Sequence, residues 1–231
     1  TDKPAYAPWF IDDTPSNGKG YESAVAYAVA AKMGFPKDRV TWVPVTFDQA
    51  KAPGKKTFDF DVNQVSISEE RRKAVDFSSG YYDVRQAVIT TKGSKIADAK
   101  TVAELKDAKL GAQVGTTSYD AITQQIAPTQ QVAVFDTNDL AVQSLKTKQI
   151  DGIVVDVPTA FYMTAAQLDN GVIVGQLPAA GGAVEQFGAV LAKGSPLTAC
   201  VSKAVDALRT DGTLTSLQTQ WLSNSGAPEL K

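Results

Sequence analysis

The sequence predicts an α/β fold of two lobes, built from short apolar strands that alternate with helices. At 231 residues the chain is long enough for two small domains, and no low-complexity linker marks a boundary between them. In the second half a strand followed by a helix recurs several times, which is the rhythm of a parallel sheet. In this repeat, strands are expected at 110–114, 132–135, 152–155 and 172–174, and helices begin near Ser118, Asn138 and Pro158.

The elements outside this repeat follow from the same patterns of apolar residues. An alanine-rich helix is expected at 21–33, and Gly34 and Pro36 end it. Pro53 and Gly54 break the chain further on, so the helix before them is short or missing. The remaining strands are expected at 40–45, 58–62, 86–91 and 187–191, and the remaining helices at 196–208 and 213–222.

The densest group of polar residues follows the strand expected at 58–62. Apolar and polar residues alternate there, and over 65–68 they alternate in the opposite phase, which predicts a turn or bulge near Gln64. Ser68 and the acids after it have the pattern of a helix start, and Arg71 follows. Hydroxyls, free backbone N–H groups and a guanidinium are therefore expected to converge, and such a spot suits a carboxylate.

Composition excludes several classes of function. The chain is 43% hydrophobic and 21% charged, which is ordinary for a globular protein, and its net charge of -2 gives no reason to expect nucleic acid as a partner. It has no histidine and a single cysteine, so an intramolecular disulfide is impossible and a zinc site is not expected. That cysteine, Cys200, lies in an apolar helical pattern and is expected in the core.

No metal or other cofactor is expected. Asp59, Asp61 and Asn63 have a spacing superficially like that of a calcium loop, and Glu70 follows them. Gln64 stands where a calcium loop needs glycine, and the residues alternate as a strand does. The pattern therefore favours a strand over a calcium site.

Six motifs extend over nearly the whole chain: AYAPWF, QVSISEERRKAVDFSSGYY, LGAQVGTTSYD, QIDGIVVDVPTAFY, QFGAVLAKGSPLT and DGTLTSLQTQWL. In order and spacing they resemble the extracytoplasmic amino-acid-binding proteins of ABC importers, solute-binding protein family 3. The resemblance implies the two-lobe periplasmic-binding-protein-like (type II) fold, in which each lobe is a β-sheet flanked by helices and two crossing strands join the lobes. It implies lobe one at 1–88 and 188–231, and lobe two at 89–187.

The resemblance also implies a site for a free L-amino acid, closed by a hinge between the lobes. It assigns the ligand carboxylate to Arg71, Thr116 and Thr117, the ammonium to Asp156 and Ser66, and the side chain to Tyr6, Trp9, Phe47 and Gln64. The residues alone leave other interpretations open: Asp156 could cap the helix near Pro158, and the aromatic residues could plug the core. The spacing of the family motif implies Arg71, five residues after Ser66, and not its neighbour Arg72.

Two other functions use the same scaffold. One is an enzyme resembling cyclohexadienyl or arogenate dehydratases, for which Glu69, Glu70 and Glu185 are the candidate acids. The other is a ligand-sensing domain. Because histidine is absent, the affinity of a carrier for an amino acid with a neutral side chain is expected to be flat from about pH 5.5 to 8. If a carboxyl in the site had a strongly shifted pKa, the affinity would instead change with pH in this range.

The expected partners are a free L-amino acid and the membrane permease of an ABC importer, and the protein is expected to be a monomer. The expected location is extracytoplasmic, in a periplasm or at the cell surface on a lipid anchor. No signal peptide is visible in the given sequence, and the resemblance implies a short apolar strand before Thr1. The identity of the amino acid stays open, because aromatic residues suit flat, cationic and apolar side chains alike.

Overall fold

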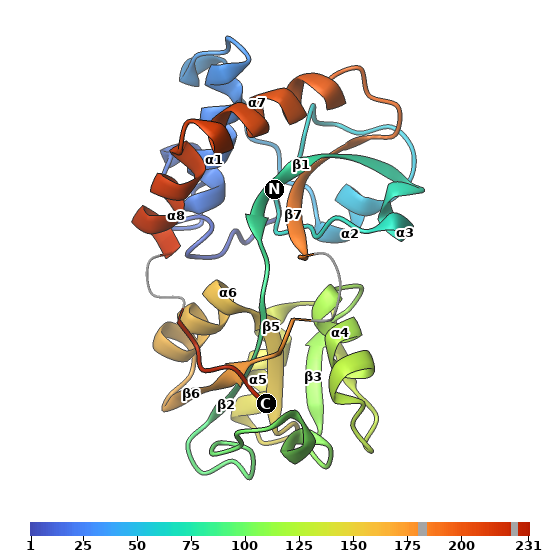
Figure 1. The fold of residues 1–231 in the computed structure, drawn as a ribbon, viewed down its shortest axis with the longest axis vertical. Coiled ribbons are helices and arrows are strands. Elements are labelled where there is room, and N and C mark those ends of the chain that lie inside the picture. The colour runs from blue at the N-terminus through green and yellow to red at the C-terminus, as the bar shows by residue number, and fades with distance from the viewer. Residues whose placement is uncertain (180–183, 223–225) are drawn as a thin grey trace. The chain divides into compact units, whose positions relative to one another are not determined.

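The structure, a computed structural model, describes residues 1–179, 184–222 and 226–231. The chain forms two compact units (Figure 1). Unit 1 comprises Thr1–Val84 and Glu185–Ser223, and unit 2 comprises Arg85–Val184 and Asn224–Lys231. The prediction of two α/β lobes is confirmed.

The tail of the chain differs from the expected division. The resemblance implies that 188–231 belongs wholly to the first lobe, whereas 226–231 packs in unit 2. The amide of Leu230 donates to the carbonyl of Gln176 at 2.9 Å, the amide of Gln176 donates to the carbonyl of Pro228 at 2.8 Å, and the Leu230 side chain is buried. Such a short tail has no periodicity, so the sequence carried no signal for this second entry into unit 2.

Unit 2 is built on a five-stranded sheet of order β4-β3-β5-β2-β6. β3 pairs in parallel with β4 and β5, whereas β2 pairs antiparallel with β5 and β6. The four strands of the expected parallel repeat, β3, β4, β5 and β6, therefore run in one direction, because β5 and β6 both pair antiparallel with β2 between them. β2 lies outside that repeat and runs the opposite way, a direction that its apolar run does not encode. The strands are β2 (Gln86–Thr91), β3 (Leu110–Gln113), β4 (Ala133–Phe135), β5 (Gly152–Asp156) and β6 (Gly171–Gln176).

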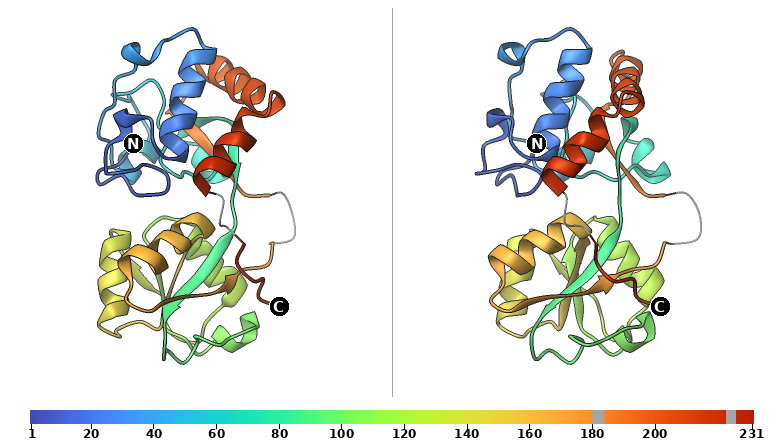
Figure 2. Two further views of the ribbon diagram at one scale, coloured as in Figure 1. Left: turned by 90° about the vertical axis from the view of Figure 1, so that its left-hand side faces the viewer. Right: turned by 60° about the vertical axis from the view of Figure 1, so that its left-hand side comes forward.

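Side chains alternate between the two faces of this sheet, and each face has its own core. Val88 and Val154 pack in the core that includes α4, while Ile89 and Ile153 pack in the core that includes α5 and α6. Helices accordingly cover both faces (Figure 2). The helical segments are η3 (Val102–Leu105), α4 (Thr117–Ala121) with the π-helix η4 (Ile122–Ile126), α5 (Asn138–Lys146), and α6 (Val157–Tyr162) with the π-helix η5 (Met163–Gln167).

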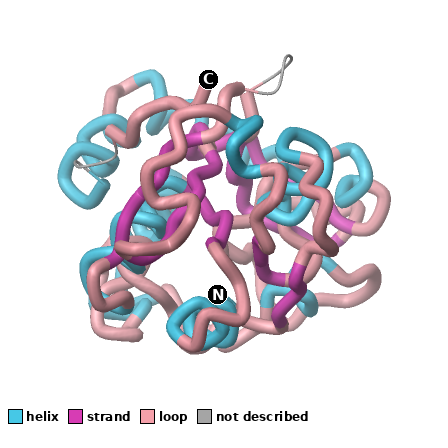
Figure 3. Tube along the Cα trace, turned by 90° about the horizontal axis from the view of Figure 1, so that it is seen from below, coloured by secondary structure: helices cyan, strands magenta, loops and turns pink. Residues whose placement is uncertain are grey.

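Unit 1 has a smaller sheet, in which β1 and β7 pair antiparallel, and three longer helices. Long loops connect its elements (Figure 3). Its strands are β1 (Val75–Asp83) and β7 (Gln186–Ala192), and its helical segments are η1 (Pro15–Asn17), α1 (Tyr21–Lys32), η2 (Lys37–Arg39), α2 (Phe47–Lys51), α3 (Glu69–Arg72), α7 (Thr198–Thr210) and α8 (Thr213–Leu222).

Two expected strands of unit 1 do not form. Residues 40–45 have no strand assignment, and 58–62 contributes only an isolated bridge between Asp61 and Val190. An alternating pattern becomes a strand only where a neighbouring segment pairs with it along its length. In the described residues, 40–45 pairs with Thr1 alone: the Val45 amide donates to the Thr1 carbonyl at 2.9 Å, and the Thr1 ammonium donates to the Val43 carbonyl at 3.4 Å. The long strand β1 was instead not predicted.

Cys200 is exposed on α7, so the expectation that it lies in the core is wrong. The helix buries Val201, Val205 and Leu208. Cys200 precedes this stripe by one position, which turns its side chain by about 100° around the helix axis.

The start of α1 requires a glycine. Gly20 has φ 97° and ψ 156°, a conformation that is essentially restricted to glycine. A Cβ at this position would lie 2.4 Å from the carbonyl oxygen of Trp9. The same carbonyl accepts the amide of Glu22 at 3.0 Å, so the close approach sets where the helix begins.

Gly20→Ala is expected to lower the free energy of unfolding by at least about 2 kcal/mol, since strain and overlap with a fixed carbonyl add together. Urea denaturation followed by circular dichroism measures it. Gly34→Ala is the matched control: Gly34 has φ 88° but nothing within 4 Å of the added Cβ. It is expected to cost only about 1 kcal/mol. Equal losses would show that the approach to Trp9 is unimportant.

Candidate functional site

The turn before α3 gathers three of the predicted site residues in unit 1. The Ser68 hydroxyl caps the helix by accepting the Arg71 amide at 3.2 Å. The Arg71 Nη1 donates to the carbonyl of Ser66 at 2.7 Å, and the guanidinium lies 5.6 Å from the centroid of the Phe47 ring. The Ser66 hydroxyl donates to Oε1 of Glu185 at 2.6 Å. Ser66, Arg71 and Phe47 therefore lie together.

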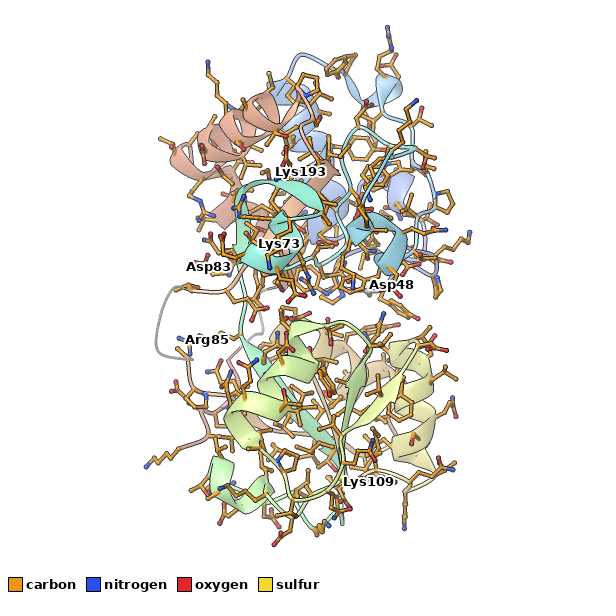
Figure 4. The ribbon with its side chains drawn as sticks, turned by 90° about the vertical axis from the view of Figure 1, so that its right-hand side faces the viewer. Asp48, Lys73, Asp83, Arg85, Lys109 and Lys193 are labelled. Carbon is orange, nitrogen blue, oxygen red and sulfur yellow. The ribbon has the colours of Figure 1, made fainter. Side chains whose placement is uncertain are left out.

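The neighbouring arginine has a different environment. Arg72 Nε is 3.6 Å from Oε1 of Glu69, its side chain is 42% exposed, and its guanidinium lies 5.8 Å from the Phe77 ring centroid. Its carbonyl accepts Lys193 Nζ at 2.7 Å, and Lys193 is labelled in Figure 4. The two arginines thus contact different rings, as expected for adjacent positions on a helix.

Lys51 is a cation of this region that the sequence reasoning missed. Its Nζ lies 3.9 Å from the Phe47 ring centroid and 3.1 Å from Oδ1 of Asp48, which Figure 4 labels. Burial lowers the pKa of Lys51, and the nearby charge of Arg71 lowers it further. The position of Lys51 four residues after Phe47 on one helix was the available signal. Two cationic groups therefore lie near the Phe47 ring.

The predicted aromatic contacts separate into two kinds. Trp9 is 0% exposed and packs in the core, with ring centroids of Tyr82, Phe187 and Tyr21 at 5.3, 5.4 and 6.0 Å. Tyr6 is half-buried in the loop just before it. The sequence left open whether Trp9 contacts a ligand or fills the core, and in the structure it lies in the core.

Gln64 forms the turn that the change of phase predicts. Its φ is 49°, which is left-handed backbone for a residue that is not glycine. Its amide donates to Oε1 of Glu22 at 2.7 Å, and its side-chain amide donates to Oε2 of the same carboxylate. The hydroxyl of Tyr81 also donates to Glu22 Oε1. Glu22 was not foreseen as part of the site.

Unit 2 gathers a second group around Asp156. Asp156 ends β5 beside α6, where its side chain makes no cap hydrogen bond, so the capping alternative lacks its bond. Gln86 on β2 is paired with Asp156 on β5. Its Nε2 donates to Asp156 Oδ1 at 3.0 Å, and its Oε1 accepts the Ser118 hydroxyl at 2.8 Å. Gln86 was missed by the sequence reasoning. The signal for it was a polar residue opening an apolar strand.

The predicted threonines belong to the same edge of the sheet. Because β3 and β5 run parallel, their carboxyl ends meet at one edge, where ligands collect in such folds. Thr116 follows β3, accepts the amide of Tyr119 at 3.3 Å and donates its hydroxyl to the Gln113 carbonyl at 2.7 Å. Thr117 opens α4, next to the Ser118 that Gln86 binds. Asp156, Thr116 and Thr117 are thus brought together.

The electrostatics of Glu22 are unusual for a glutamate. It is 0% exposed, and in the described parts of the chain no lysine or arginine forms an ion pair with it. Burial raises its pKa from 4.5 to about 7, while the hydrogen bonds from Tyr81 and Gln64 oppose that rise. Glu22 therefore titrates near neutral pH.

Two kinds of feature are absent from the described residues. They contain no group of three or more His, Cys, Asp or Glu side chains that could hold a metal ion. None of their helices is both long and apolar enough to cross a membrane.

Comparison with known proteins gives the following findings. Residues 2–224 match the sequence model of the bacterial extracellular solute-binding proteins, family 3. The L-cystine-binding protein TcyJ of Escherichia coli (strain K12) is 28% identical over 218 residues, which are 94% of this chain and 79% of that protein. The structure of an ancestral arginine-binding protein bound to glutamine has a TM-score of 0.76 and 29% identity, and the match covers 96% of both chains.

A further solved structure is that of an ancestral amino acid-binding protein, a precursor of cyclohexadienyl dehydratase. It has a TM-score of 0.72 and 28% identity, over 94% of this chain and 91% of that one. The predicted two-lobe fold class is confirmed by these likenesses.

The raised pKa of Glu22 gives a testable dependence of stability on pH. A group whose pKa is raised on folding binds more protons in the folded state, so its stabilising contribution is lost as pH rises from about 4.5 to 7. Between pH 5 and 8 the free energy of unfolding of Glu22→Gln should therefore fall less than that of the unsubstituted protein, by about 2–3 kcal/mol. Urea denaturation at several pH values measures both slopes.

The acids whose pKa is lowered do not interfere in this window. Asp76, Glu104 and Asp211 lose their stabilising contribution only as pH falls below their ordinary pKa values of 3.8 to 4.5. Asp61, whose pKa burial also raises, is present in both proteins, but its charge acts on Glu22, so part of the difference between the two slopes comes from Asp61. Parallel stability curves would contradict the assignment to Glu22.

Proposed function

Since this chain belongs to the bacterial extracellular solute-binding proteins of family 3, we propose that it binds a free L-amino acid and delivers it to an ABC importer in the membrane. The observation that carries the proposal is the group of Ser66, Arg71 and Phe47, in which the guanidinium is fixed by a 2.7 Å hydrogen bond and lies over an aromatic ring. A guanidinium fixed in this way suits bidentate binding of a carboxylate.

Both ends of a zwitterion have a matching group in this chain. The carboxylate has the cation Arg71, and the ammonium has the carboxylate Asp156, which Gln86 orients. The first group lies in unit 1 and the second in unit 2. In the proposed complex the ligand carboxylate is bound by Arg71, Thr116 and Thr117, the ammonium by Asp156 and Ser66, and the side chain by Tyr6, Phe47 and Gln64. Trp9, buried in the core, is not among the proposed ligand contacts.

Closure of the two units on the ligand is part of the proposal. The chain passes from one unit to the other at 84–85, at 184–185 and again before 226–231, and Figure 4 labels Asp83 and Arg85 at the first crossing. A few residues at the ends of β1, β2 and β7 can absorb the change in φ and ψ that closure needs. We place the carrier outside the cytoplasm, in a periplasm or on a lipid anchor, and propose that it acts as a monomer without catalysing a reaction.

One finding favours a second candidate, an enzyme that dehydrates prephenate or arogenate. The solved structure of an ancestral amino acid-binding protein, itself a precursor of cyclohexadienyl dehydratase, is 28% identical to this chain. Such chemistry needs an acid in the site. Of the expected acids, Glu69 and Glu70 are both exposed, and Glu69 pairs with Arg72, whereas Glu185 accepts the Ser66 hydroxyl. Glu185 is therefore the acid that this alternative would use.

A thermal-shift screen of the twenty amino acids tests the proposed function. A ligand that binds only the folded state stabilises it by RT ln(1 + [L]/Kd), which is about 2.7 kcal/mol at a concentration of 100 Kd. At least one amino acid is expected to raise the melting temperature by several degrees and to be recovered chemically intact. Failure of all twenty would contradict the carrier function, and steady conversion of prephenate or arogenate would establish the enzyme.

The two neighbouring arginines give a matched pair of substitutions. Arg71→Ala is expected to weaken binding of the amino acid found in the screen by roughly 2–5 kcal/mol, because a buried ion pair loses one partner. Arg72→Ala is the control and should change affinity by less than about 1 kcal/mol, as an exposed ion pair does. Isothermal titration calorimetry measures both. Equal effects would remove Arg71 from the carboxylate site.

A further inference from the structure

The loop that carries Ser66 contains a backbone conformation that needs external support. Gln64 has φ 49°, and its neighbours Val62 and Val65 are buried. A residue with a side chain keeps such a conformation only where the surrounding structure holds it. At this turn the alternation of apolar and polar residues changes phase. The positions of Val65 and Ser66 therefore depend on the left-handed backbone of Gln64.

The support comes from one carboxylate. Glu22 accepts both the backbone amide and the side-chain amide of Gln64, the first at 2.7 Å. Tyr81 completes the set by donating its hydroxyl to the oxygen that also accepts the Gln64 amide. Three donors therefore converge on Glu22. A protonated carboxyl has a hydrogen on one oxygen and is a weaker acceptor, so the three hydrogen bonds are strongest in the ionised form.

Among the described residues, no lysine or arginine forms an ion pair with Glu22. Tyr81 faces it from β1, Tyr21 adjoins it on α1, and Asp61 lies on the loop before Gln64. Asp61 is itself buried and forms an ion pair with the N-terminal ammonium at 3.0 Å. Two buried carboxyls and two phenols thus occupy this region. The charge of Asp61 disfavours the ionised form of Glu22, whereas the hydrogen bond from Tyr81 favours it.

We propose that Glu22 is a positioning residue, whose buried carboxylate holds the left-handed turn at Gln64 and thereby sets the affinity of the site for its amino acid. The proposal rests on the proposed function and deepens it. Glu22 lies beneath the loop and acts through Gln64. The ionised carboxylate holds the turn, and the protonated carboxyl releases part of it.

The consequence is a carrier whose affinity and stability respond to pH in opposite directions. Burial raises the pKa of Glu22 to about 7, so lowering the pH through neutrality protonates it. Protonation removes an uncompensated buried charge and stabilises the fold, but it loosens the turn and weakens ligand binding. The flat affinity expected from the absence of histidine does not hold if Glu22 acts in this way.

The test has one arm without ligand and one with it. In the first, the backbone and side-chain amide signals of Gln64 are followed by NMR between pH 5.5 and 8.5. They are expected to titrate with a midpoint near 7 in the unsubstituted protein and not at all in Glu22→Gln. In Tyr81→Phe the midpoint should move to higher pH, because the hydrogen bond from Tyr81 lowers the pKa of Glu22. Signals of Gln64 that are constant with pH would overturn the proposal.

In the second arm, calorimetry measures the affinity for L-glutamine, the amino acid bound in the related ancestral protein. The ligand keeps its charges over this range, so any change reports the protein. The unsubstituted protein is expected to bind at least about threefold more weakly at pH 6 than at pH 8. Glu22→Gln should bind weakly at both values, without pH dependence. A pH profile of Glu22→Gln identical to that of the unsubstituted protein would overturn the proposal.

A double substitution separates positioning from general stability. Glycine adopts left-handed backbone without support, so adding Glu22→Gln to the Gln64→Gly background should change the affinity less than it does alone. Equal effects in both backgrounds would show that Glu22 does not act through Gln64. If L-glutamine and the other amino acids fail to bind, the proposed function fails, and the NMR arm still decides whether Glu22 holds the turn.

Discussion

The packing of aromatic rings around Trp9 is the interaction on which unit 1 depends. The indole meets rings from α1, β1 and β7 edge to face, so one buried side chain ties together segments that are far apart in the sequence. The hydroxyl of Tyr21 then donates to the Tyr81 carbonyl at 2.6 Å, which fixes the first turn of α1 against β1. Glu22 and Tyr81 are adjacent to these anchored positions. The core and the support of the Gln64 turn are therefore set by the same contacts.

The sequence predicted those elements whose signal is local. The strand expected at 86–91 coincides with β2, and the helix expected at 213–222 coincides with α8, because each is a continuous apolar or amphipathic run bounded by turn residues. The strands expected at 40–45 and 58–62 have equally good patterns and do not form as strands. Strand formation depends on hydrogen bonds with a distant partner, and the alternation of side chains says nothing of that partner.

The candidate site divides in the same way. Ser66, Thr116 and Asp156 lie in turns or at strand ends, and Arg71 lies in the short helix α3, positions that short motifs describe. Glu22 could not be found in this way, because an acid in the first turn of a helix is ordinarily solvated and complements the helix dipole.

Gln86 and Lys51 were not predicted as site residues for a related reason. The relevance of Gln86 comes from Asp156, with which it pairs across the sheet, and that of Lys51 comes from Phe47 and Arg71. A side chain that matters through its neighbours becomes visible only when those neighbours are known. The local motifs therefore found groups suited to a ligand, and the structure was needed to find what holds them.

Because residues 226–231 return to unit 2, segments of the two units alternate along the chain and are therefore synthesised alternately. All five strands of the unit 2 sheet leave the ribosome before β7, α7 and α8 of unit 1, and the tail that carries Leu230 follows them. Unit 1 therefore lacks one of its two strands while the sheet of unit 2 is already complete, and unit 2 lacks part of its core until unit 1 has all of its helices. Domains usually fold as units in the order of translation. In this chain neither unit can bury its whole core during synthesis before the other has nearly finished.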